Sequence, residues 1–193
     1  WKYFENTPTR KIKGRFDELS KTRKIKESIP DWIDDIAVKE LGEAKWSKEI
    51  QALNEQADVI LRVNTLKTTK EKLQNILFDL DIETETLKDY PDALRLKERT
   101  NVFSTEAFKE GLFEVQDASS QLVADFLQVE PGMRVVDTCA GAGGKTLSLS
   151  AQMQGKGRLL AMDVEQWKLD NLKQRARRAN AHNIETRIIA SSK

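Results

Sequence analysis

One glycine-rich run has the residue types and spacing of a nucleotide-type binding site. Residues 137–146 read DTCAGAGGKT, and a second acid, Asp163, ends the apolar run Arg158–Asp163 downstream. Small residues let backbone amides come close to a ligand, and free N–H groups at the start of a following helix bind carboxylates or phosphates. An acid at the end of the second run can accept hydrogen bonds from both ribose hydroxyls. These features predict a site for a cofactor with a ribose and an anionic group.

Two nucleotide motifs fit the run incompletely. A dinucleotide motif, GxGxxG, matches at Gly141 and Gly143, but Thr146 stands where its third glycine should be. That glycine permits close packing of helix on strand. A P-loop, GxxxxGK[ST], matches at residues 144–146, but Cys139 stands at its opening glycine. A P-loop NTPase therefore remains an alternative, and it predicts magnesium-dependent ATP binding.

A site for S-adenosylmethionine (SAM) fits better. Its usual form is an acid at the end of the first strand, followed by small residues at every second position. Here Asp137 is followed by Cys139, Gly141 and Gly143 in that spacing, and Asp163 is the acid at the end of the next strand. We therefore favour SAM as the cofactor.

The surrounding elements should hold this site at one edge of a sheet. The sequence predicts a strand over 133–136, a helix from the glycine-rich turn to about 153, a strand over 158–163, a helix over 165–180 and a strand over 185–190. This order is half of a doubly wound α/β sheet of Rossmann-like type. Since its crossovers are right-handed, the glycine-rich turn and Asp163 should lie at the same carboxyl edge.

The preceding residues predict a smaller module. Apolar spacing indicates helices over 28–41 and 45–57, a strand over 58–66, a helix over 70–80, strands over 82–87 and 93–97, and a helix over 115–129. The β-α-β-β order fits a ferredoxin-like α+β sheet. We expect three parts: a basic helical segment over 1–57, the α+β module over 58–110, and half of the Rossmann-like domain over 111–193.

Composition excludes several classes of protein. The chain is 39% hydrophobic and 33% charged and has no run of about 20 apolar residues, which excludes a disordered or membrane-spanning chain. We therefore expect no membrane partner. One cysteine and one histidine exclude a disulfide framework and a multi-cysteine zinc site, so we also expect no bound metal. No signal-peptide core opens the chain, which suggests the cytoplasm. The net charge is only +1, but residues 1–28 hold nine Lys/Arg and four Asp/Glu, a pattern that suits a polyanion as well as a solvated helix.

Four blocks in order give the sequence a family resemblance. They are LRVN at 61–64, YPDALRL at 90–96, VQDASSQ at 115–121 and DTCAGAGGKT at 137–146. Together they resemble the Nop/Sun family of RNA cytosine-5 methyltransferases, and most of all the bacterial Sun-type enzymes that methylate small-subunit ribosomal RNA. The resemblance implies SAM as cofactor and ribosomal RNA as partner.

The family implies a covalent mechanism. A cysteine thiolate adds to C6 of cytosine, the activated C5 attacks the methyl group of SAM, and a second cysteine assists β-elimination. In the family both cysteines follow the fourth and fifth strands, whereas Cys139 lies in the cofactor loop and is the only cysteine here. We therefore expect no catalytic residue in this chain and no methyl transfer by it alone. A non-catalytic truncated relative that binds RNA or SAM is the other alternative. The family usually places an Asp at the end of the third strand, where this chain has Ala190.

The resemblance also assigns the site residue by residue. Cofactor binding is expected from Cys139, Ala140, Gly141, Ala142, Gly143, Gly144, Lys145 and Asp163. RNA contacts are expected from Arg62 and Asn64 in the small module and from Lys173, Arg175, Arg177 and Arg178 on the basic helix. The alternative for the basic helix is a solvated charged face.

Overall fold

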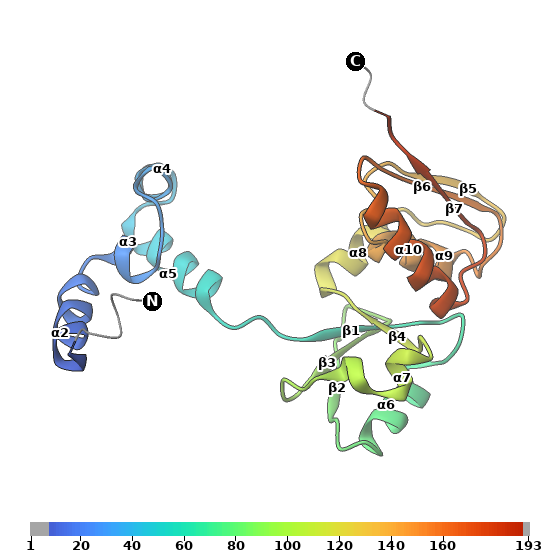
Figure 1. Cartoon of the computed structure of the whole chain (residues 1–193), viewed down its shortest axis with the longest axis horizontal. Coiled ribbons are helices and arrows are strands. Elements are labelled where there is room, and N and C mark those ends of the chain that lie inside the picture. The colour runs from blue at the N-terminus through green and yellow to red at the C-terminus, as the bar shows by residue number, and fades with distance from the viewer. Residues whose placement is uncertain (1–7, 191–193) are drawn as a thin grey trace. The chain divides into compact units, whose positions relative to one another are not determined.

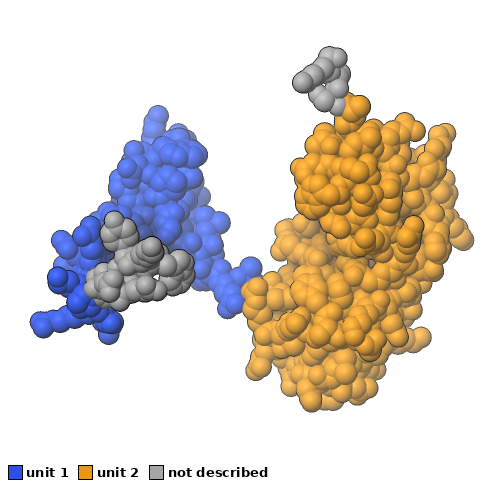
Figure 2. All heavy atoms as spheres, viewed as in Figure 1, with its two compact units in different colours: residues 1–57 blue, residues 58–193 orange. Residues whose placement is uncertain are grey.

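The computed structural model describes residues 8–190 and separates the chain into two compact units, residues 1–57 and 58–193 (Figure 2). The described part of the first unit is helical, with α2 (Thr9–Leu19), α3 (Arg23–Lys26), α4 (Asp31–Leu41) and α5 (Glu43–Asn54). Gly42 ends α4 at a positive φ of 79°. Asp34 accepts hydrogen bonds from Arg23 and, at 2.8 Å, from the indole N–H of Trp46, which ties α3, α4 and α5 together.

The second unit begins with a four-stranded sheet (Figure 1). Its elements are β1 (Ile60–Val63), α6 (Lys70–Phe78), β2 (Thr84–Thr86), β3 (Ala93–Leu96), the 3-10 turn η1 (Val102–Ser104), α7 (Glu106–Lys109) and β4 (Phe113–Val115). The strand order is β2-β3-β1-β4 with every neighbour antiparallel, which is the ferredoxin-like arrangement predicted from the sequence. Leu73 and Leu77 of α6, Ala107 of α7 and Phe113 of β4 belong to one buried apolar cluster beneath the sheet.

Strand β4 was not predicted. Val115 was expected to enter a helix, but it is paired with Leu61 of β1. The helix, α8 (Ala118–Phe126), begins only after Asp117, whose side chain accepts from the N–H groups of Ser119 and Ser120. The small sheet therefore extends to residue 115, past the boundary expected at residue 110.

A parallel three-stranded sheet follows. It contains β5 (Arg134–Asp137), α9 (Gly144–Gln152), β6 (Arg158–Asp163), α10 (Gln166–Ala179) and β7 (Ile184–Ile188) in the order β5-β6-β7. This is the predicted α/β half-sheet. Right-handed crossovers that advance in one direction put α9 and α10 on the same face, and Leu147 and Leu172 pack there against Leu159. In the part of the chain that is described, no helix is long and apolar enough to cross a membrane.

Candidate cofactor site

Asp137 fixes the start of the glycine-rich loop. One carboxylate oxygen accepts the N–H of Cys139 at 3.3 Å, and the other accepts the hydroxyl of Thr146 at 2.7 Å. The side chain thereby joins the end of β5 to the first turn of α9. Thr146 is fully buried. A P-loop uses this hydroxyl to hold magnesium, and here the hydroxyl is directed at Asp137 inside the protein, so the geometry does not favour the NTPase alternative.

Asp163 holds the other side of the loop. Its carboxylate accepts the N–H of Gly141 at 2.9 Å and the N–H of Glu165 at 3.0 Å. The backbone N–H of Glu165, more than that of Gly141, lowers the pKa of Asp163 below its ordinary value. The side chain therefore stays ionised near neutral pH and acts only as an acceptor. The predicted meeting of the loop and Asp163 at one sheet edge is confirmed.

Gly141 and Gly143 of the loop have different surroundings. Gly143 has φ of 90°, and a Cβ there would lie 2.7 Å from Cγ of Leu172, so this glycine allows α10 to approach. Gly141 has φ of 55°, and a Cβ there would meet nothing within 4 Å. The loop is thus closely packed at Gly143 and open at Gly141.

The start of α9 leaves donors for a ligand. Gly143 is its N-cap and gives no side-chain hydrogen bond. The first N–H groups of a helix have no intrahelical acceptor, and they carry the positive end of the helix dipole. Cys139 and Lys145 are exposed beside them. The site therefore combines backbone donors with one ionised acid, a set suited to a carboxylate or phosphate at one end and hydroxyl groups at the other. Among the described residues, no group of three His, Cys, Asp or Glu side chains could hold a metal ion.

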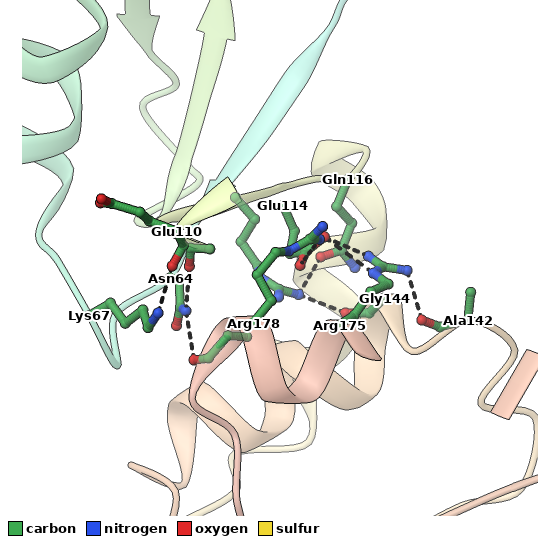
Figure 3. A network of polar contacts seen from close by, with 12 residues as sticks. Asn64, Lys67, Glu110, Glu114, Gln116, Ala142, Gly144, Arg175 and Arg178 are labelled. Atoms are coloured by element: carbon green, nitrogen blue, oxygen red, sulfur yellow. Dashed lines mark hydrogen bonds and ion pairs between the residues drawn. The ribbon is translucent and has the colours of Figure 1, made fainter. Parts of the chain in front are cut away.

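The residues expected to contact RNA divide into two groups. Arg62 and Asn64, from which RNA contacts were expected, are only 4% and 3% exposed and therefore lie inside the unit. Asn64 donates to the carbonyls of Gly111 and Ala179 at 2.8 and 2.9 Å (Figure 3). The bond to Ala179 joins the small module to α10, and the bond to Gly111 stays within the module.

Two of the four residues of α10 that were expected to contact RNA are also paired within the unit. Arg175 and Arg178 both form ion pairs with Glu114, at 2.9 and 2.7 Å, and Arg178 lies over the ring of Phe108. Of the four, Lys173 and Arg177 are therefore exposed, whereas Arg175 and Arg178 are partly buried.

Two family models match the chain. The model described as the ferredoxin-like domain of RsmF/B-like methyltransferases matches residues 29–103, and that of the 16S rRNA methyltransferases RsmB/F matches residues 124–191. The chain belongs to the RsmB/F methyltransferase family. The second match covers the strands and loop that form the candidate site, and the first covers most of the ferredoxin-like sheet.

Curated relatives agree with this assignment. A probable ribosomal RNA small subunit methyltransferase B of Synechocystis is 33% identical over 146 residues, which is 75% of this chain and 33% of that protein. The ribosomal RNA small subunit methyltransferase B of Klebsiella pneumoniae is 34% identical over 151 residues, 75% of this chain and 34% of that protein. The chain spans about a third of the length of these relatives.

Solved structures show the same fold. The crystal structure of PH0851 aligns with a TM-score of 0.78 at 28% identity, covering 85% of this chain and 37% of that one. A methyltransferase homolog from Pyrococcus horikoshii aligns with a TM-score of 0.77 at 25% identity, covering 85% and 54%. NSun6 from Pyrococcus horikoshii, solved with SFG, has a TM-score of 0.79 at 15% identity over 83% and 65%, a likeness of fold alone.

Proposed function

We propose that this chain supplies the SAM-binding part of an enzyme that methylates C5 of cytosine in small-subunit ribosomal RNA. The observation that carries the proposal is the pairing of an ionised Asp163 with an open glycine-rich loop and uncapped helix amides at one sheet edge. The names of the curated relatives support the RNA substrate.

The donor set fits SAM. The amides that open α9 would receive the carboxylate of its methionine part, and residues 139–145 would line the sulfonium region. Asp163 would accept hydrogen bonds from the ribose hydroxyls. Its ionised carboxylate has about four acceptor sites, and the two backbone N–H groups occupy only two of them. SAM supplies an electrophilic methyl group, and this chain's residues bind and orient it.

Methylation at C5 of cytosine needs a thiolate beside the base, and the single cysteine of this sequence lies elsewhere. Cys139 lies on the loop proposed for the cofactor, and its N–H is held by Asp137. We propose that its thiol contacts the cofactor rather than the base, and that the 193 residues alone bind SAM without transferring its methyl group. Formation of 5-methylcytosine by this polypeptide from labelled SAM and ribosomal RNA would refute that assignment.

RNA contact is proposed for a smaller set of residues than the sequence suggested. Lys173 and Arg177 are exposed on α10 and could meet phosphates. The basic α2 and α3 are a second surface of the same charge. Such contacts would raise affinity for any RNA and weaken with salt, without reading a sequence.

Equilibrium dialysis with radiolabelled SAM tests the cofactor assignment. We expect saturable binding that unlabelled S-adenosylhomocysteine displaces and that magnesium and ATP do not. Asp163→Ala should abolish it, whereas Asp170→Ala should not, because Asp170 is an exposed acid on α10 that pairs with its helix neighbours Gln166 and Lys173. Displacement by magnesium ATP, or equal binding by both variants, would contradict the proposal.

A further inference from the structure

Side chains of the ferredoxin-like sheet and of α10 form hydrogen bonds to the backbone of the glycine-rich loop. Arg62 of β1 donates to the carbonyl of Gly144 and to the side chain of Gln116, both at 2.6 Å. Arg175 of α10 donates to the carbonyl of Ala142 at 2.7 Å. The two guanidinium groups therefore end on loop carbonyls on either side of Gly143, the N-cap of α9. Figure 3 shows Arg175 between Glu114 and Ala142.

One carboxylate from the sheet anchors this arrangement. Glu114 of β4 is 3% exposed and accepts from Arg175 through Nε at 3.2 Å and Nη2 at 2.9 Å. Its other oxygen accepts from Arg178 at 2.7 Å. Arg175 thus spans from the sheet to the loop, while Arg178 is bound to the same carboxylate with no hydrogen bond to the loop.

The cluster holds charges of both signs. Arg175 and Arg178 pair with the buried Glu114. Burial lowers the pKa of Arg62 to about 10, which leaves its guanidinium charged at neutral pH, and the carboxylates of Glu114, Asp92 and Asp125 favour that charged form. A buried ion pair is a weak way to stabilise a junction, because desolvation offsets much of the attraction. Apolar side chains could join the small sheet to α10 equally well. The stability of this junction therefore does not explain why two arginines donate to carbonyls of the loop.

The hydrogen bonds from Arg62 and Arg175 to the loop carbonyls also affect the backbone N–H groups of the loop. A cation on a peptide oxygen polarises that peptide and strengthens its N–H as a donor. For the oxygen of Gly144 that N–H belongs to Lys145, in the first turn of α9, where no intrahelical acceptor exists. For the oxygen of Ala142 it belongs to Gly143, which donates to Ala140 at 2.9 Å and closes the turn.

We propose that Arg62 and Arg175 are positioning residues for the cofactor loop, so that the ferredoxin-like sheet is a working part of the cofactor site. The inference rests on the proposed binding of SAM at this loop. Arg175 holds the closed turn, and Arg62 orients and polarises the amide that faces the cofactor carboxylate. Glu114 sets the position of Arg175.

A matched pair of variants tests the proposal. Arg175→Gln and Arg178→Gln each remove an ion pair with Glu114, but only the first also removes a bond to the loop. Both should lower the melting temperature of the chain. We expect Arg175→Gln to raise the Kd for S-adenosylhomocysteine about tenfold, the loss of one charge-assisted hydrogen bond. Arg178→Gln should leave Kd within about twofold, and Arg62→Lys, which keeps the charge but loses the forked donor, should follow Arg175→Gln.

Hydrogen exchange of the ligand-free variants gives a second readout. Amides of residues 139–146 should exchange faster in Arg175→Gln than in Arg178→Gln, because only the first frees the carbonyl of Ala142. Equal Kd values and equal loop exchange in the two variants would overturn the inference while leaving SAM binding intact. Absence of binding by the wild-type chain would overturn the proposed function, and the inference with it.

Discussion

Gly111, which lies just before β4, packs closely against the backbone of α10, and its replacement gives a measurable test of that contact. Its φ is 73°, and a Cβ built there would lie 2.3 Å from the carbonyl oxygen and 2.8 Å from the carbonyl carbon of Arg178. Gly111→Ala should therefore incur two costs. The left-handed conformation costs an alanine about 1–2 kcal/mol, and moving backbone aside costs about 1–3 kcal/mol more.

Gly132 is a matched control within the same unit. It also has a positive φ, 95°, but a Cβ there would meet nothing within 4 Å. Gly132→Ala should lower the free energy of unfolding by about 1–2 kcal/mol, and Gly111→Ala by about 2–5 kcal/mol. Urea unfolding followed by circular dichroism measures both. Losses that agree within about 0.5 kcal/mol would refute the close contact between the sheet and α10, since surface changes usually stay within that margin.

Three further predictions concern single side chains. Thr146→Val removes the hydroxyl that Asp137 accepts, so it should lower the free energy of unfolding by about 1–3 kcal/mol in urea titrations; an unchanged value would contradict the buried bond. Asp117→Ala removes the N-cap of α8 and should cost about 0.5–2 kcal/mol in the same assay, whereas no loss would mean that α8 is capped otherwise. Asp163 has a lowered folded pKa, so its stabilising contribution is present above its unfolded value of about 3.9 and disappears as pH falls through the folded value. Melting temperatures of Asp163→Asn should fall less than those of wild type across this acid range, and parallel curves would argue against the bonds to Gly141 and Glu165.

The elements around the site were predictable because their signals are local. Strand β6 has the bounds that its apolar run indicated, and α6 begins after Thr69, whose hydroxyl accepts from Lys72 as a helix cap. Asp137, the last residue of β5, and the glycines of the turn that follows it place the loop at the sheet edge. Periodicity and capping were sufficient for this part of the fold.

The role of the polar residues in the small sheet was not predictable in the same way. Arg62 and Asn64 carry groups typical of a surface, yet their acceptors, Gly144 and Ala179, lie far along the chain. Strand β4 has only three residues, too few for the alternation of apolar and polar residues that predicts a strand. The sequence therefore gave no indication that Glu114 lies in a sheet. Its importance is visible only once the fold brings α10 over the sheet. Lys173 and Arg177, by contrast, remain on the surface, and their contact with RNA stays a prediction.

The most direct test of the account is to observe which amides respond to the cofactor. In ¹H–¹⁵N spectra of the chain titrated with S-adenosylhomocysteine, we predict shifts concentrated at residues 139–146 and at Asp163 and its neighbours. Saturation of these shifts at a single affinity would support one site at this sheet edge. Shifts centred elsewhere in the chain, or no shift at the loop while magnesium ATP produces one, would contradict the central claim that the loop and Asp163 form a SAM site.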